Sequence, residues 1–196
     1  MTFGAKMKQA KTLTDKQLKA VLAHCATRRH AARDRAIVLF SHLAGLRAKE
    51  IALLTVQNVL GEQGIRDEFV LSVEQTKGRK ARRVFVSSRL RAELAAYLKQ
   101  AKMRNGCAAL FQSQKGAAFS ANTMCQLLIR IYEDCGLEGA TSHSGRRSFI
   151  TNLAAKGVGV RVLAELAAHA SIATTQRYID VNDEQMRRAV ELASAT

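Results

Sequence analysis

The chain has 196 residues, of which 47% are hydrophobic and 24% are charged, which is typical of one folded soluble domain with a sizeable core. No apolar run approaches the roughly 20 residues that a membrane-spanning helix needs, which argues against insertion into a membrane. The 31 Lys and Arg residues against 16 Asp and Glu give a formal net charge of +15. So large an excess favours a polyanionic partner, with nucleic acid ahead of an acidic membrane surface.

The N-terminal stretch and the cysteines indicate the compartment. The stretch "MTFGAKMKQAKTL" is basic but lacks the apolar core and cleavage pattern of a signal peptide, so we expect the protein to stay in the cytoplasm. No pair of cysteines forms CxxC, and His24 beside Cys25 has no further partner at ligand spacing. We therefore expect reduced thiols and no metal site. The four cysteines are Cys25, Cys107, Cys125 and Cys135.

The first third of the chain is predicted to be helical after a mobile basic tail at residues 1–12. "TDKQLKAVLAHC" begins with Thr14 and Gln17 at the spacing of a capping box, and apolar residues follow at helical period. Two more helices are predicted, at residues 31–44 and 48–54. Gly45 is expected to end the first of these two.

The pattern then changes to alternation. "EFVLSVEQ" and "ARRVFVS" predict a two-stranded hairpin whose tip, "TKGRK", is basic. A helix is predicted over residues 89–103, then a small hairpin or extended turn at Lys115 and Gly116, then a helix that Ser120 caps and that runs to Cys135. Further helices are predicted at residues 143–156, 160–168, 172–178 and 183–193. The predicted class is mainly α with a small β-hairpin element, in one compact domain.

The segment "LAGLRAKEI" is the first whose side chains could take part in binding or catalysis. Arg47 lies where one helix ends and the next begins, and Glu50 shares its helical face. A guanidinium beside free backbone N–H groups suits an anionic oxygen. For this segment alone, a structural Arg–Glu pair is the simpler interpretation.

The second such segment is "QTKGRKARRV". Lys77 stands at the start of the turn, from which it could reach into a groove or donate a proton. Taken alone, the segment favours a solvated basic turn, or a turn whose phosphate contacts only position DNA. The cations that follow Lys77 are Arg79, Lys80, Arg82 and Arg83.

Two later segments complete the set. In "TSHSGRRSFI", His143 and Arg146 are spaced to project from one helical turn, either as a phosphate-binding pair with an acid/base member or as a capping histidine and a surface arginine. In "HASIATTQRY", His169 ends one helix and Tyr178 ends the next. The two side chains could therefore be held close together.

As a group, these residue types describe phosphodiester chemistry without a metal. Arginines donate paired N–H groups to the two non-bridging oxygens, on which charge builds in the transition state. A tyrosine nucleophile keeps the bond energy in a covalent link, and a lysine can protonate the leaving sugar oxygen. Clustered carboxylates of the kind that hold Mg²⁺ are not evident, which argues against a two-metal nuclease.

The order "AGLRAKEI … QTKGRK … HSGRR … AHASIATTQRY" resembles the catalytic domain of tyrosine recombinases, the phage-integrase and Xer family, from about Leu13 to Asp180. The resemblance implies that fold for residues 13–180, and a DNA recombinase that works through a 3′-phosphotyrosyl intermediate as a tetramer on two DNA duplexes. It implies no metal, ATP or small-molecule substrate. Residues 181–196 would form a helix that docks on a neighbouring protomer or packs on its own domain.

The resemblance assigns roles to single residues. Tyr178 resembles the nucleophile, Arg47 and Arg146 the two clamps on the scissile phosphate, and Lys77 the general acid. His143 resembles a second proton-transfer member, and His169 the histidine that hydrogen-bonds the phosphate. Glu50 matches an acidic position with a supporting role. Further DNA contacts are expected from Arg79, Lys80, Arg82, Arg83, Arg147 and Arg177.

The sequence departs from the family pattern at several points. The usual "HxLRH" reads "HSGRR", so Gly145 replaces a leucine and Arg147 a histidine, and "LGH" reads "AAH". We expect the lost leucine to weaken packing of that helix and the added arginine to alter proton handling. Only about a dozen residues precede the first helix, as in short family members or the catalytic half of a longer one. A catalytically decayed DNA-binding regulator and a type IB topoisomerase-like enzyme are the alternatives.

Overall fold

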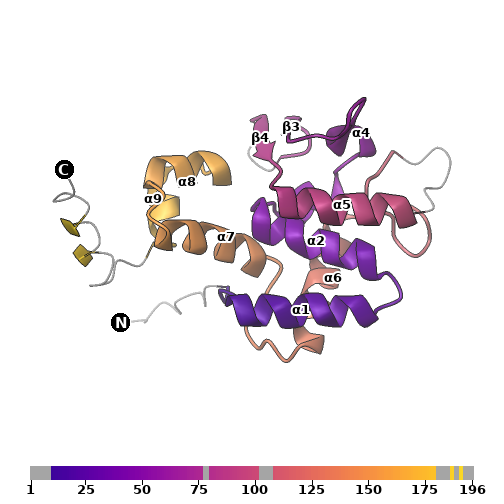
Figure 1. Cartoon of the computed structure of the whole chain (residues 1–196), viewed down its shortest axis with the longest axis horizontal. Helices are drawn as coiled ribbons and strands as arrows, with labels where there is room; N and C mark the ends of the chain where they lie inside the picture. The colour runs from indigo at the N-terminus through magenta and orange to yellow at the C-terminus, as the bar shows by residue number, and fades with distance from the viewer. Residues whose placement is uncertain (1–9, 77–79, 102–107, 180–185, 188–189, 192–196) are drawn as a thin grey trace, which may run out of the picture.

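The computed structural model describes residues 10–76, 80–101, 108–179, 186–187 and 190–191. Within them it forms helices α1–α9 and two antiparallel sheets of two strands each (Figure 1). The elements are α1 Asp15–Thr27, α2 Ala31–Leu43, α3 Ala48–Ala52, α4 Val56–Val59, β1 Leu60–Gly61, β2 Gly64–Ile65, β3 Glu68–Leu71, β4 Arg82–Phe85, α5 Ser88–Gln100, α6 Ala121–Asp134, α7 Ser144–Ala155, α8 Val160–Ala167 and α9 Ile172–Gln176. None of the helices in these ranges is long and apolar enough to cross a membrane.

Most predicted elements are confirmed. The hydroxyl of Thr14 accepts from the backbone N–H of Gln17, and the Thr14 backbone N–H donates to Gln17 Oε1 at 3.0 Å, so the capping box starts α1. Strands β3 and β4 pair antiparallel with Phe69 opposite Val84, as the alternation predicts. The short elements α4, β1 and β2 were not predicted.

Helix α2 forms the centre of the core. It packs against α1, α5 and α7, and Figure 1 shows it between α1 and α5. Four consecutive residues of α2, Ile37 to Phe40, are fully buried. The Phe40 ring meets the Phe111 ring edge-on, with centroids 5.9 Å apart. A helix buried on several sides gives the end of α2 a fixed position, and the site begins at that end.

Two glycines allow α7 to approach α2 closely. A Cβ on Gly145 would lie 2.6 Å from Ser41 Oγ, and a Cβ on Gly45 would lie 2.5 Å from Phe149 Cδ1. Gly45 also has φ +62, a conformation that favours glycine. The structure therefore differs from the expectation that the lost leucine weakens packing of this helix. The missing side chain instead lets the backbone of α7 lie directly against α2.

The predicted tail and C-terminal helix fall partly outside the described residues. Residues 1–9 and most of 183–193 lie there, so both predictions stay open for those positions. The last residues of the predicted tail contact the helical body. The Lys11 N–H donates to Gly139 O at 3.2 Å, and Arg147 Nε donates to Thr12 Oγ1 at 3.0 Å.

Candidate active site

The junction of α2 and α3 places Arg47 and Glu50 together, as predicted. Arg47 precedes α3, and its backbone N–H donates to Glu50 Oε2 at 2.9 Å. Its Nη1 donates to Glu50 Oε1 at 2.8 Å. Glu50 has no solvent exposure, so the carboxylate is buried against the guanidinium. The ion pair fixes Arg47 while leaving its side chain partly exposed.

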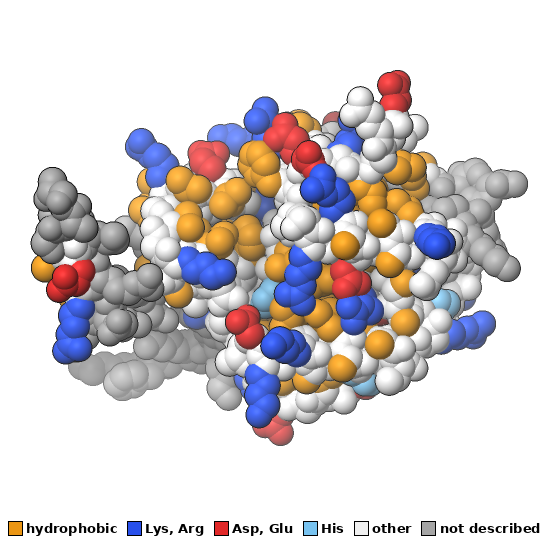
Figure 2. All heavy atoms as spheres, viewed as in Figure 1, with side chains coloured by type: hydrophobic (Ala, Val, Ile, Leu, Met, Phe, Trp, Pro, Cys, Tyr) orange, Lys and Arg blue, Asp and Glu red, His pale blue; other side chains and the backbone are white. Residues whose placement is uncertain are grey.

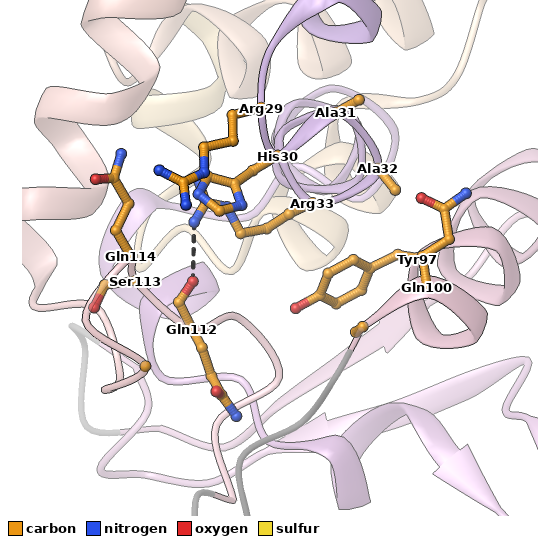
Figure 3. A pocket seen from close by; sticks show the side chains of 12 residues that line it. Arg29, His30, Ala31, Ala32, Arg33, Tyr97, Gln100, Gln112, Ser113 and Gln114 are labelled. Atoms are coloured by element: carbon orange, nitrogen blue, oxygen red, sulfur yellow. Dashed lines mark hydrogen bonds between the residues drawn. The ribbon is translucent and has the colours of Figure 1, made fainter.

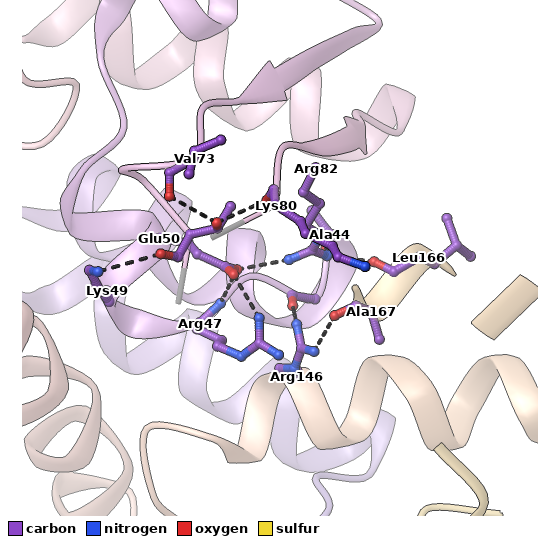
Figure 4. Close-up of polar contacts among 12 residues, drawn as sticks. Ala44, Arg47, Lys49, Glu50, Val73, Lys80, Arg82, Arg146, Leu166 and Ala167 are labelled. Carbon is purple, nitrogen blue, oxygen red and sulfur yellow. Dashed lines mark hydrogen bonds and ion pairs between the residues drawn. The ribbon is translucent and has the colours of Figure 1, made fainter. Parts of the chain in front are cut away.

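Arg82, the first residue of β4, also pairs with Glu50 (Figure 4). Its Nη1 donates to Glu50 Oε2 at 2.8 Å, and its Nη2 donates to the carbonyls of Ala44 at 3.1 Å and Leu166 at 2.5 Å. Only 3% of Arg82 is exposed. The expected DNA contact of Arg82 is therefore corrected, because the side chain points into the protein and its donors are engaged there.

Arg146 approaches the same cluster from α7. Its Nη1 donates to Gly45 O at 2.6 Å, its Nη2 donates to Ala167 O, and the residue is 4% exposed. Burial lowers the pKa of Arg146 to about 9, with further contributions from Arg47 and Arg82. The group still carries its charge at neutral pH. Among the described residues of this cluster there are three guanidinium groups and one carboxylate, that of Glu50, which pairs with Arg47 and Arg82. The cluster therefore carries an excess of two positive charges.

His169 lies beside the cluster, just after α8. Its Nδ1 and Thr175 Oγ1 are hydrogen-bonded at 2.8 Å. Burial first, and then the positive charges of Arg146, Arg47 and Arg82, together lower the pKa of His169 to about 4. The imidazole is therefore neutral at pH 7. A neutral ring beside three cations can donate to an anion without adding to their mutual repulsion.

Tyr178 stacks on His169, which brings the two residues together as predicted. The ring centroids are 5.7 Å apart and the planes are inclined by 22°. The Arg147 guanidinium lies 5.4 Å from the centroid of the Tyr178 ring. Thr151 Oγ1 donates to the Tyr178 carbonyl at 3.3 Å, which ties the end of the tyrosine segment to α7.

The remaining predicted residues are distributed differently. His143 is the N-cap of α7 and is exposed, whereas Arg146 one turn later is buried, so the two do not share one environment. Lys77 and Arg79 lie outside the described residues. Lys80 and Arg83 are exposed and line a cavity of about 510 Å³ together with Arg47, Arg82 and His169. Arg177 is also exposed.

Surface charge alone does not locate this site. On the face shown in Figure 2, Lys and Arg side chains are spread among hydrophobic and neutral ones. A second pocket of about 420 Å³ lies at the start of α2, where Arg29, His30 and Arg33 face Tyr97 (Figure 3). None of the predicted catalytic residues lines it. Arg33 Nη1 donates to Gln112 O there at 3.0 Å, so this arginine is held by the protein itself.

Sequence reasoning missed the inward role of Arg82. Arg82 and Val84 are both buried on β4, whereas Arg83 and Phe85 are exposed. The alternation that predicts the strand therefore also indicates which of the two neighbouring arginines points inward. Thr175, which fixes the His169 ring, gave no signal that separates it from Thr174.

Comparison with known proteins identifies the family of the chain. Residues 11–185 match the sequence profile of the phage integrase family. The chain belongs to the phage integrase family. It is 31% identical over 186 residues to tyrosine recombinase XerA of Pyrococcus horikoshii, a match that covers 93% of this chain and 61% of that protein. This phage integrase family member thus spans about three fifths of the length of that relative.

Solved structures confirm the fold. The catalytic domain of bacteriophage HP1 integrase superposes with a TM-score of 0.65 at 21% identity, covering 93% of this chain and 95% of that one. The XerH site-specific recombinase bound to a palindromic difH substrate superposes with a TM-score of 0.71 at 22% identity, covering 97% of this chain and 55% of that one. The tyrosine-recombinase catalytic-domain fold predicted from the sequence is therefore confirmed for this phage integrase family member.

Proposed function

We propose that this chain is the catalytic domain of a site-specific DNA recombinase that cuts and rejoins strands through a 3′-phosphotyrosyl intermediate. One observation carries the proposal: Tyr178 stacks on a histidine that borders a cluster with an excess of two positive charges. Such a cluster suits the phosphate oxygens on which charge builds during transfer. Family membership and the DNA-bound XerH structure support the same conclusion.

The chemistry follows from the positions of these groups. Arg47 and Arg146 donate to the non-bridging oxygens of the scissile phosphate, and His169 adds a third donor. The phenolic oxygen of Tyr178 forms a bond to phosphorus while the bond from phosphorus to the 5′-oxygen breaks. The 5′-oxygen leaves with a proton as a free hydroxyl. In the reverse step a 5′-hydroxyl attacks the phosphotyrosine and releases Tyr178, so the exchange needs no ATP.

Proton transfer is assigned to two residues, Lys77 and His143. Lys77, as the family resemblance implies, gives the proton to the 5′-oxygen. It follows Thr76 in the sequence, and both Thr76 and Lys80 line the cavity that contains Arg47 and His169. His143, exposed at the start of α7, accepts the proton of Tyr178 or relays it.

Double-stranded DNA is the proposed partner, bound by a dimer or tetramer of this chain. The formal charge of +15 favours the DNA backbone. Arg79, Lys80, Arg83, Arg147 and Arg177 are proposed to contact phosphates. We expect the reaction to take place in the cytoplasm, where bacterial and phage DNA lie.

A covalent-adduct assay tests the proposal. The protein is incubated with nicked suicide duplexes that carry the inverted repeats found beside its gene, and an adduct that resists SDS is expected. Tyr178→Phe should form none, because it lacks the attacking oxygen. An equal adduct from Tyr178→Phe would contradict the nucleophile. Binding without an adduct would favour a decayed regulator, and relaxation of any plasmid regardless of sequence would favour a topoisomerase.

A further inference from the structure

Arg82 and Arg146 bridge the same two helix ends through neighbouring carbonyls. Arg82 donates to Ala44 O at the end of α2 and to Leu166 O at the end of α8. Arg146 donates to the next carbonyl of each segment, Gly45 O and Ala167 O. The last carbonyls of a helix have no partner within the helix and carry partial negative charge, so a guanidinium is a suitable partner for them.

The two arginines differ in how many N–H donors remain available to bind a ligand. Both N–H groups of Arg82 Nη2 are used by carbonyls, and its Nη1 donates to Glu50. Its Nε is buried and has no hydrogen-bond partner within the described part of the chain. Arg82 thus connects β4, α3, α2 and α8, and most of its donors are engaged by protein groups. Arg146 makes two such bonds and retains donors for a phosphate.

The hydrogen bond from Arg82 to the Leu166 carbonyl affects the position of Tyr178. Leu166 lies three residues before His169, and His169 in turn stacks on Tyr178. The position of the nucleophile therefore depends on where α8 ends. The Leu166 carbonyl is held by the guanidinium that also pairs with Glu50, the partner of Arg47.

We propose that Arg82 is a positioning residue, which holds the end of α8, and with it His169 and Tyr178, in register with the Arg47–Glu50 pair. The inference rests on the proposed recombinase function. Arg82 does not touch the phosphate in this account. It sets the distance between the clamp that holds the phosphate and the segment that attacks it, and misplacement of a reacting group by about 1 Å can lower a rate by roughly 100-fold.

The test compares cleavage rate with DNA affinity. In Arg82→Met, the single-turnover rate of adduct formation at saturating DNA should fall by roughly 100-fold, while the DNA concentration for half-saturation changes by less than about threefold. Arg82→Lys should remain slow, because an ammonium cannot reach three acceptors in the fork geometry of a guanidinium. A wild-type rate in folded Arg82→Met would overturn the proposal.

Two further variants separate positioning from loss of fold. Arg82→Met leaves part of the Glu50 charge unpaired, so the double variant Glu50→Gln/Arg82→Met removes that charge and should melt closer to wild type, yet still cleave slowly. Arg35→Met is the matched control, because Arg35 also pairs with a glutamate, Glu93, and donates to a helix carbonyl, Leu22 O, at 3.1 Å, away from the site. It should cleave at the wild-type rate. A double variant that regains both stability and rate would overturn the proposal.

A modified substrate tests which half of the reaction is affected. A DNA with sulfur in place of the bridging 5′-oxygen has a leaving group that needs no proton. The defect of Arg82→Met should persist on this DNA, because the position of Tyr178 is what has changed. Full rescue would mean that Arg82 acts through the general acid and would overturn the proposal. If wild type forms no adduct on either DNA, the proposed function fails, and that result is distinct from failure of this inference.

Discussion

The arginine cluster and the His169–Tyr178 segment face each other but are built differently. Arg47, Glu50 and Arg82 sit on elements that belong to the main hydrophobic cluster, which runs from Leu13 to Ala140. Helices α8 and α9 are short, and their buried residues lie outside that cluster. Figure 1 shows α7, α8 and α9 to one side of the body formed by α1, α2, α5 and α6.

This difference in construction matches two different roles, stabilising charge and positioning Tyr178. Groups that stabilise charge act best when they are preorganised, and the core provides that for the arginines. Tyr178, the proposed nucleophile, follows the short helix α9, in which only Thr175 is buried, and such segments open at lower free energy than the core. The carbonyls of Leu166 and Ala167, held by Arg82 and Arg146, are the main polar links between the two regions. We therefore expect substitutions in the two regions to have different effects on stability and on chemistry.

The largest effect is expected at Arg146, where the two regions meet. Arg146→Ala should lower the rate of adduct formation by roughly 100- to 1,000-fold, because it removes a donor aimed at the developing charge. Thermal unfolding should remain cooperative, since Arg82 still holds the neighbouring carbonyls. Arg161→Ala, at an exposed position of α8, makes the same change in charge and should leave the rate within about threefold of wild type. Loss of the folded state in Arg146→Ala would show that this arginine is structural.

The next largest effect is expected on the stability of the core at acid pH, through His42. His42 is 5% exposed, its Nδ1 has no hydrogen-bond partner within the described residues, and burial lowers its pKa from 6.5 to about 4. Between these values the unfolded chain binds a proton that the folded chain does not, so stability falls as pH falls. The free energy of unfolding should drop by about 3 kcal/mol across this window. Urea titrations at several pH values measure the slope, and His42→Leu should flatten it.

His169 provides the comparison for that experiment. Its pKa is also lowered to about 4, chiefly by burial, but it lies in the segment outside the main core. His169→Asn should flatten the pH dependence less than His42→Leu, because local opening of α8 and α9 lets His169 take up a proton without global unfolding. Equal flattening by the two variants would show that both regions unfold as one unit.

A smaller effect is expected where α7 meets α2. Gly145→Ala places a Cβ within 2.6 Å of Ser41 Oγ and should lower the free energy of unfolding by about 1–3 kcal/mol, despite the better helix propensity of alanine. Adding Ser41→Gly should restore part of the loss, because it removes the atoms that clash. Gly159→Ala is the control, since no heavy atom lies within 4 Å of a Cβ there. Unchanged stability in Gly145→Ala would mean that the two helices can move apart freely.

The parts of the fold that could be predicted are those with a local signal. Thr14 with Gln17 and the alternation of β3 and β4 are visible within a few residues, and each structure formed as expected. Helix α4 and strands β1 and β2 have two to four residues, too few to show a period, and they were missed. Their formation depends on neighbours such as Ala108, whose carbonyl accepts from the Val56 N–H at 3.0 Å.

In the site, too, local contacts could be predicted from the sequence and long-range contacts could not. The pairing of Arg47 with Glu50 could be predicted because the residues are three apart, at the N-cap and in the first turn of one short helix. The pairing of Arg82 with Glu50 joins residues 32 positions apart, so no local pattern identifies the partner. Gly145 was misjudged for a related reason. A missing leucine suggests lost contacts in a sequence, but the neighbour that occupies the space, Ser41, is known only from the packing of α2.

The smallest expected effect is at Ala168, between α8 and His169. Ala168 has φ 46 and ψ 54, a left-handed conformation that disfavours any residue with a Cβ by roughly 1–2 kcal/mol. Ala168→Gly removes that strain but gives the unfolded chain more freedom, so a net gain of about 0.5–1 kcal/mol is expected. Because α8 and α9 lie outside the main core, the gain should appear as slower hydrogen exchange of the α9 amides, by roughly two- to fivefold, with little change in the urea midpoint.

The control for Ala168 is Ala170, a neighbour that does not have positive φ. Ala170→Gly should lower stability slightly, because glycine there relieves no strain and only loosens the chain. If Ala168→Gly moves the urea midpoint by its full gain, the end of α8 unfolds together with the core. The segment that carries Tyr178 would then be as firmly held as the arginines, and the two regions would unfold as one unit.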